Sequence, residues 1–214
     1  MEKITANTAP LKILNGRQVY TYEAYRNLMA DLVARGETTG PNQSEDFARY
    51  TKMNHVRMER LEKTTELSEA LLERVQQIDE NYTFVVLTEA WCGDAAQNIP
   101  IFQKIVEANP HFKIRLVLRD ENLELMDQHL TNGGRAIPKI LVIRDQTEEV
   151  LTDWGPRPAT AQQMVMEYKA IPEDRRKPYM EFVVEVQKWY NHDKTLETQQ
   201  ELVHLLDAHI LKKS

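Results

Sequence analysis

The chain has 214 residues, a formal net charge of −6 at pH 7, 42% hydrophobic residues and 28% charged residues. These values are typical of one globular domain with extensions. The acidic charge argues against a broad nucleic-acid-binding surface. No apolar run is long enough to span a bilayer, and the polar first ten residues lack the apolar segment of a secretory signal. We therefore expect a cytoplasmic protein that binds neither nucleic acid nor membrane.

Residues 1–80 are predicted to form a helical extension, because apolar residues recur at helical spacing in three successive stretches. Asn42 and Glu45 have capping-box spacing, which predicts that the second helix begins after Asn42. We expect all three stripes to pack into the core, as methionine and aromatic side chains at this spacing usually do. The stripe of the second helix contains Phe47, Tyr50, Met53, Val56 and Leu61.

Residues 81–171 alternate between strand and helix patterns, which predicts the order β-α-β-α-β-β-α. The predicted strands are 83–89, 113–119, 139–144 and 149–153, and the predicted helices are 94–109, 121–128 and 160–170. Thr160 and Gln163 form a capping box at the start of the last of these helices. The first two strands should be parallel, and the last two should form an antiparallel hairpin. Residues 172–214 return to helical spacing.

The single cysteine, Cys92, falls between the first predicted strand and the helix that follows it. One cysteine cannot form an internal disulfide, so an oxidising compartment is not required. The unpartnered N–H groups and the dipole of a helix start lower the pKa of a thiol there. Asp94 would raise it, and the sequence leaves open which effect dominates. We expect Cys92 to be exposed and reactive.

The segment Trp91-Cys92-Gly93 resembles the start of the Trp-Cys-Gly-Pro-Cys signature of the thioredoxin family. Pro100 lies eight residues after the cysteine, like the family's helix-kinking proline, and residues 135–143 are similar to the segment that carries its cis-proline. Gly155 is similar to the family's groove glycine. The resemblance implies an α/β thioredoxin-like fold, with a mixed four-stranded sheet, over residues 81–171. Helical extensions at 1–80 and 172–214 would flank this domain.

Two further runs, 88–95 and 154–158, resemble a bacterial group of thioredoxin family proteins. The chain also departs from the family pattern. Ala95 replaces the resolving cysteine, Asp94 replaces the proline between the two cysteines, and Val86 replaces the buried acid that assists proton transfer. Dithiol–disulfide cycling within the motif is therefore chemically impossible.

The resemblance implies that Cys92 is the catalytic residue, and that Ile137 offers backbone hydrogen bonds to an extended substrate beside a cis Pro138. The substrate-binding residues that it implies are Trp91, Gly93, Asp94, Ile137, Pro138, Trp154, Gly155 and Arg157. For the two tryptophans, packing beneath the groove is an equally good interpretation. Lys139 and Arg157 are candidate cations near the sulfur, although a solvated surface position is the simpler interpretation of both.

The leading functional hypothesis is a monothiol redox protein, a thiol-disulfide oxidoreductase without a resolving cysteine. Cys92 would attack a disulfide of a protein or small molecule, and an external low-molecular-weight thiol such as glutathione would resolve the product. The alternatives are a non-catalytic module that binds peptides or proteins, and a sensor in which Cys92 is oxidised to sulfenic acid. We expect no cofactor, and the six scattered histidines predict no metal site.

Overall fold

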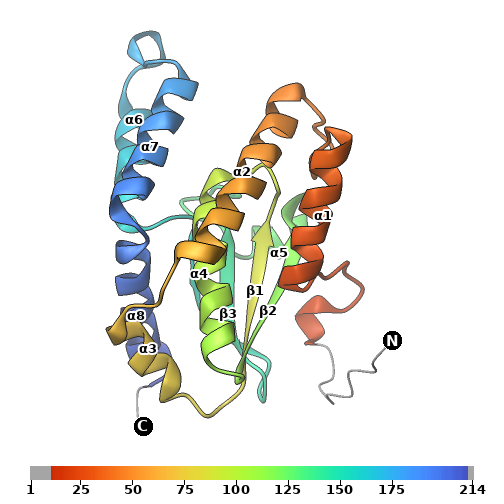
Figure 1. Cartoon of the computed structure of the whole chain (residues 1–214), viewed down its shortest axis with the longest axis vertical. Coiled ribbons are helices and arrows are strands. Elements are labelled where there is room, and N and C mark those ends of the chain that lie inside the picture. Colours follow the sequence, from red (N-terminus) through yellow and green to blue (C-terminus); the bar gives the residue numbers. More distant parts are fainter. Residues whose placement is uncertain (1–10, 212–214) are drawn as a thin grey trace.

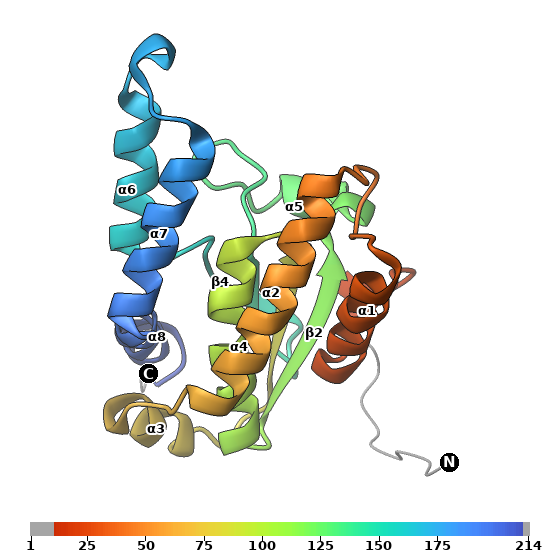
Figure 2. The ribbon, with the colours of Figure 1, turned by 45° about the horizontal axis from the view of Figure 1, so that its top comes forward.

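The computed structural model describes residues 11–211, and Figures 1 and 2 show their arrangement. The strands are β1 (Tyr82–Thr88), β2 (Phe112–Leu118), β3 (Lys139–Arg144) and β4 (Glu149–Trp154). The helices are α1 (Tyr22–Arg35), α2 (Glu45–Thr64), α3 (Glu69–Gln76), α4 (Gly93–Ala108), α5 (Leu123–Asp127), α6 (Ala159–Ala170), α7 (Tyr179–Asp193) and α8 (Leu196–His209). Short 3₁₀ helices occupy Lys12–Leu14, Arg119–Glu121 and Glu173–Arg175.

The four strands form one mixed sheet in the order β2-β1-β3-β4. β1 pairs with β2 in parallel and with β3 in antiparallel, and β3 and β4 form the predicted hairpin. Every residue of β1 is buried, as its apolar, β-branched run predicts for a central strand covered on both faces. The predicted α/β class and the order β-α-β-α-β-β-α are therefore confirmed. Cys92 follows β1 and begins α4, so the sheet fixes its position.

The helices before β1 share the core of the sheet. Tyr25 and Met29 of α1 and Met58 of α2 are buried in the same cluster as the strands. Tyr20 exchanges two backbone hydrogen bonds with Leu116 of β2, of 2.8 and 2.9 Å, so this segment covers the outer edge of that strand. The predicted division into three ranges stays a prediction.

The predicted buried face of α2 is confirmed at Leu61 and wrong at Met53 and Val56. Met53 and Val56 are 43% and 59% exposed, whereas Thr51 and Asn54 are buried. The hydroxyl of Thr51 is hydrogen-bonded to that of Thr38 at 2.6 Å, and the amide of Asn54 donates to the Ala90 carbonyl at 2.9 Å. These partners satisfy the hydrogen-bonding groups of Thr51 and Asn54 and so allow their burial. A prediction from the spacing of apolar residues does not identify such polar residues.

Both predicted capping boxes are also wrong. Ser44 caps α2, and its hydroxyl accepts the Phe47 N–H. Pro158 precedes α6 and provides no side-chain cap. The hydroxyl of Thr160 instead donates to Glu197 of α8 at 2.9 Å, so a contact between distant helices replaces the local one.

The helices after β4 pack in two ways. α6 and α7 form a limb that stands beside α2 and α4 (Figure 2), and a separate small cluster holds the limb together. In that cluster the rings of Tyr168 and Phe182 stack at 4.1 Å. α8 returns to the main core, where Leu202 and Leu206 are buried. None of the helices within residues 11–211 is long and apolar enough to cross a membrane.

Candidate functional site

Cys92 caps the start of α4. Its sulfur accepts the Ala95 N–H at 3.4 Å, and its thiol donates to the Ile137 carbonyl at 3.2 Å. The Ile137–Pro138 bond is cis, as the resemblance implies. Cys92 therefore lies directly against the segment that precedes β3.

The expected exposure of Cys92 is wrong, because the residue is only 7% exposed. Burial, and next the negative charge of Asp94, raise the pKa of the thiol to about 12. The Ala95 N–H and the Arg157 guanidinium act in the opposite direction and are outweighed. Burial and Asp94 therefore outweigh the helix end in setting the pKa of Cys92. The sequence could not show this, because it gives no measure of how deeply the sulfur is buried. At pH 7 the protonated thiol therefore predominates.

Asp94 connects the turn that contains Cys92 to the α6–α7 limb. One carboxylate oxygen accepts two bonds from the Arg157 guanidinium, at 2.6 and 3.0 Å, and the other accepts the Tyr190 hydroxyl at 2.8 Å. Asn98 of α4 donates to the same hydroxyl at 3.2 Å. The side chains of Asp94 and Arg157 are largely buried, which strengthens their attraction. Charged hydrogen bonds thus fix the limb beside Cys92.

Gly155 packs against the segment that carries the cis-proline. Its φ is +116°, and a Cβ added there would lie 2.2 Å from the Pro138 carbonyl oxygen. Trp154 and Lys139 are the neighbours of Gly155 and Pro138 in the chain, but their side chains bind other residues. The Trp154 indole donates to Glu201 at 2.7 Å, and the buried Lys139 is paired with Asp153 at 2.7 Å. Trp154 therefore does not line the groove, and of its two interpretations the structure favours packing.

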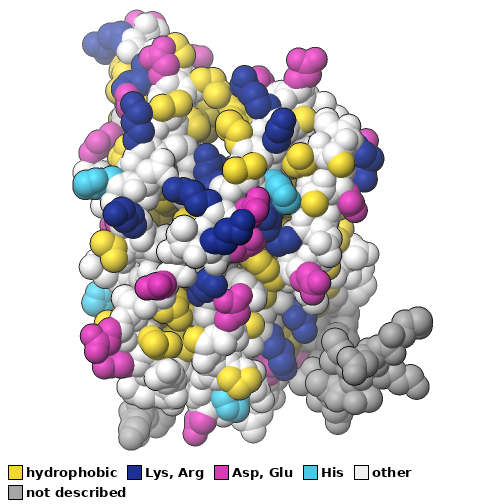
Figure 3. Space-filling view, in the orientation of Figure 1, with side chains coloured by type: hydrophobic (Ala, Val, Ile, Leu, Met, Phe, Trp, Pro, Cys, Tyr) yellow, Lys and Arg dark blue, Asp and Glu magenta, His cyan; other side chains and the backbone are white. Residues whose placement is uncertain are grey.

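A groove of about 760 Å³ opens over Cys92, between α2 and α7. The predicted site residues that line it are Trp91, Cys92, Gly93, Asp94, Ile137 and Arg157. Pro138, Trp154 and Gly155 do not line it, although Gly155 packs against Pro138 behind Ile137. Trp91 forms part of the floor, where its ring stacks on Phe47 at 4.8 Å and lies 5.0 Å beneath the Arg119 guanidinium. Figure 3 shows hydrophobic side chains gathered between α7 and α2, with Lys and Arg around them.

The sequence interpretation missed the walls of this groove. Tyr50, Met53 and Arg57 of α2 face Tyr179 and other residues of α7 across it. The tyrosine and the methionine were assigned to the core, and no pattern in the sequence indicates which face of α7 would meet α2. The one sequence signal for this wall is the stripe of aromatic and methionine side chains on α2, which can line a binding groove as well as pack into a core.

Glu89, three residues before Cys92, was also missed. Its carboxylate is buried and accepts the Asp120 N–H at 2.8 Å, while its second oxygen has no hydrogen-bond partner in the described part of the chain. Burial raises the pKa of this carboxyl. A buried acid therefore lies near the end of β1, although Val86 occupies the position at which the family resemblance would place one.

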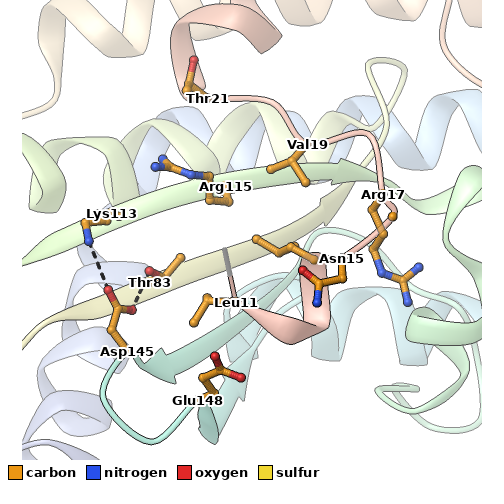
Figure 4. Close-up of a pocket in the computed structure, with 12 residues that line it drawn as sticks. Leu11, Asn15, Arg17, Val19, Thr21, Thr83, Lys113, Arg115, Asp145 and Glu148 are labelled. Atoms are coloured by element: carbon orange, nitrogen blue, oxygen red, sulfur yellow. Dashed lines mark hydrogen bonds and ion pairs between the residues drawn. The ribbon is translucent and has the colours of Figure 1, made fainter. Parts of the chain in front are cut away.

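A second cavity, of about 630 Å³, lies at the opposite end of β1 (Figure 4). There Asp145 accepts the Thr83 hydroxyl at 2.7 Å and is paired with Lys113 at 3.2 Å. These charges satisfy one another, which is typical of a structural contact. Among residues 11–211, no three His, Cys, Asp or Glu side chains gather in an arrangement that could hold a metal ion.

The contact at Gly155 predicts a large loss of stability for Gly155→Ala. The added methyl group would collide with the Pro138 carbonyl, and we expect the free energy of unfolding to fall by about 2–4 kcal/mol in urea titrations. Gly16→Ala is the matched control, because Gly16 also has a positive φ, +73°, but has nothing within 4 Å. That variant should lose only about 1 kcal/mol. Equal losses in the two variants would contradict the proposed collision.

The charge of Asp94 predicts that Asp94→Asn lowers the pKa of the Cys92 thiol toward its ordinary value. The rate of alkylation by iodoacetamide at about pH 8 should then rise about tenfold, in proportion to the thiolate. Tyr190→Phe is the control, because it removes a contact of the same carboxylate but keeps its charge. If the alkylation rate rose equally in both variants, the prediction would be contradicted, because the cause would then be loss of contacts with the α6–α7 limb and not loss of the Asp94 charge.

Comparisons with known proteins agree with this fold. A family model described as Thioredoxin matches residues 40–170, more than half of the chain, and begins within the range assigned to the N-terminal extension. PA1234, a protein of unknown function from Pseudomonas aeruginosa, has a similar structure, with a TM-score of 0.54 and 18% identity over 88% of this chain and 98% of that one. An HIV epitope-scaffold is similar, with a TM-score of 0.53 and 19% identity over 83% and 96%. No curated protein matches the sequence. With its mixed sheet, its cis-proline and this family match, the chain belongs to the thioredoxin family.

Proposed function

We propose that this thioredoxin-like domain is a binding module, and that the groove over Cys92 receives a segment of a partner polypeptide. The observation that carries the proposal is the combination of a large groove with exposed apolar walls. Tyr179 and Val184 of α7 are 64% and 50% exposed, and both face the groove, as does Met53 of α2. Apolar side chains gathered at one concave site are typical of interaction surfaces.

The state of Cys92 supports binding over catalysis. The thiol is buried, donates to the Ile137 carbonyl and has a raised pKa, so little nucleophile is present at neutral pH. The chain has one cysteine, which leaves no resolving thiol within it. A binding function requires neither, and it needs no cofactor. We infer that the protein acts in the cytoplasm, where a lone thiol stays reduced.

Monothiol redox chemistry is the second candidate, and one observation favours it. The Cys92 sulfur borders the groove and accepts a backbone N–H at the start of α4. Its thiolate would attack one sulfur of a disulfide, forming a mixed disulfide and expelling the other sulfur as a thiolate. An external thiolate, such as that of glutathione, would then attack the substrate sulfur of this mixed disulfide. That step would regenerate the Cys92 thiolate and oxidise the external thiol into a disulfide with the substrate.

The two candidates predict different reactivities. If binding is the function, iodoacetamide should alkylate Cys92 more slowly than it alkylates glutathione at pH 7. The rate should still be rising between about pH 9 and pH 11, because burial and Asp94 raise the pKa of the thiol. Faster alkylation than glutathione at neutral pH, together with mixed-disulfide formation detected by mass spectrometry, would instead support the redox candidate.

The groove itself is tested by Met53→Asp. We expect this variant to lose most of the binding that the wild-type protein shows to an array of random decapeptides, because a carboxylate would replace an apolar wall. Cys92→Ser should bind as well as wild type. Val56→Asp is the matched control, since Val56 is an exposed residue of α2 that does not line the groove. Loss of binding in Cys92→Ser but not in Met53→Asp would contradict the proposal.

A further inference from the structure

We propose that the groove between α2 and α7 selects an acidic segment, an extended peptide that carries both carboxylates and apolar side chains. This inference rests on the proposed binding function and identifies the chemistry of the partner. It assigns recognition to Arg57 and Lys188, which face the groove from opposite walls. Neither belongs to the residues that the family resemblance implies.

The charges that line the groove are unbalanced. Six cations line it, and Asp94 is its one acid among the described residues. The lining cations are Arg49, Arg57, Arg119, Arg135, Arg157 and Lys188. Four of these are paired, with Asp46, Asp120, Asp127 and Asp94. Two positive charges, those of Arg57 and Lys188, therefore remain without a carboxylate partner within residues 11–211, on a chain whose net charge is −6.

Arg57 is held in position rather than free in solvent. It is half-buried, and its guanidinium donates to the side-chain oxygen of Asn54. The amide nitrogen of Asn54 donates in turn to the Ala90 carbonyl at 2.9 Å, which ties the pair to the turn before Cys92. A Cβ added to Gly93 would lie 3.7 Å from the Arg57 guanidinium, so the cation lies beside the residue that follows Cys92.

Burial of this cation is unfavourable in the unbound protein. Burial and the neighbouring Arg60 lower the pKa of Arg57, and they outweigh the charge of Asp94, which acts in the opposite direction but is already bonded to Arg157. A carboxylate that entered the groove would supply the missing counter-charge and form charge-assisted hydrogen bonds. The site is therefore complementary to an anion, and the guanidinium geometry favours a carboxylate that accepts two bonds.

The shape of the groove favours a peptide. The residues of α7 that line it run from Tyr179 to Asn191, a length of about 18 Å at the helical rise. An extended chain of about five or six residues covers that distance. The Tyr50 hydroxyl meets the Met180 sulfur across the groove, so a peptide that fills the groove would replace this contact. Apolar walls with basic residues among them match alternating apolar and acidic side chains.

The α7 wall lies outside the residues that match the family. The family match ends at residue 170, before α7 begins at Tyr179. Lys188, Tyr179 and Val184 therefore lie beyond the matched residues. The bond between Tyr190 and Asp94 holds their helix over the site.

An array of random decapeptides, probed with the full chain, tests the inference. We expect the retained peptides to be enriched in Asp and Glu together with apolar residues. The dissociation constant of the best binder is then compared with that of a twin in which Asn and Gln replace Asp and Glu. The twin should bind about tenfold more weakly. Raising the salt concentration from about 50 to about 500 mM should weaken only the acidic peptide.

Two variants locate the recognition. Lys188→Glu and Arg57→Gln should each weaken the acidic peptide about fivefold or more and leave the neutral twin unchanged. Lys52→Glu is the control, because Lys52 is an exposed lysine of α2 outside the groove. Lys188 is exposed, so its substitution tests the inference even if Arg57→Gln fails to fold.

The outcomes separate the two proposals. Retention of peptides without enrichment in acidic residues, or an equal effect of Lys52→Glu and Lys188→Glu, would overturn acidic selection but leave groove binding intact. Retention of no peptide by the wild-type chain would overturn the binding function itself.

Discussion

The carboxylate of Asp94 is the contact on which the rest of the site depends. It accepts bonds from Arg157, which follows β4, and from Tyr190 on α7, and so it joins three parts of the chain at the start of α4. The other hydrogen bonds between α7 and the helices α2 and α4 include the neutral bond between Gln97 and Gln187 and the bond from Arg60 to Asn191. The negative charge of Asp94 also disfavours a thiolate at Cys92. The Asp94 side chain thus helps to complete the groove and also reduces the reactivity of the Cys92 thiol.

The sequence predicted the sheet because its signals are local. β1 is a short apolar run buried on both faces, β3 lies at the predicted residues 139–144, and the cis Ile137–Pro138 bond was implied by a motif that matches residue by residue. Cys92 was likewise found at the start of its helix. Each of these features depends on neighbours within a few positions, or on a resemblance that extends over the whole segment.

The chemistry of the site was harder to predict because it depends on distant contacts. The tyrosine that binds Asp94 lies 96 residues further along the chain, and α7 is the element that completes the groove over the sulfur. Burial outweighs the helix end at Cys92, and spacing alone gives no measure of burial. The buried face of α2 was mispredicted for a related reason, since Thr51 and Asn54 are buried through partners outside the helix.

The position of Trp91 has a practical consequence. Its indole lies in the floor of the groove, stacked on Phe47 and beneath Arg119, whereas Trp154 is buried against Phe102 and bonded to Glu201. A molecule that enters the groove changes the polarity around the Trp91 indole. Trp154 and the third tryptophan, Trp189 of the α6–α7 cluster, do not line the groove. The protein therefore carries its own fluorescent reporter of occupancy, and titrations can follow intrinsic emission without a label.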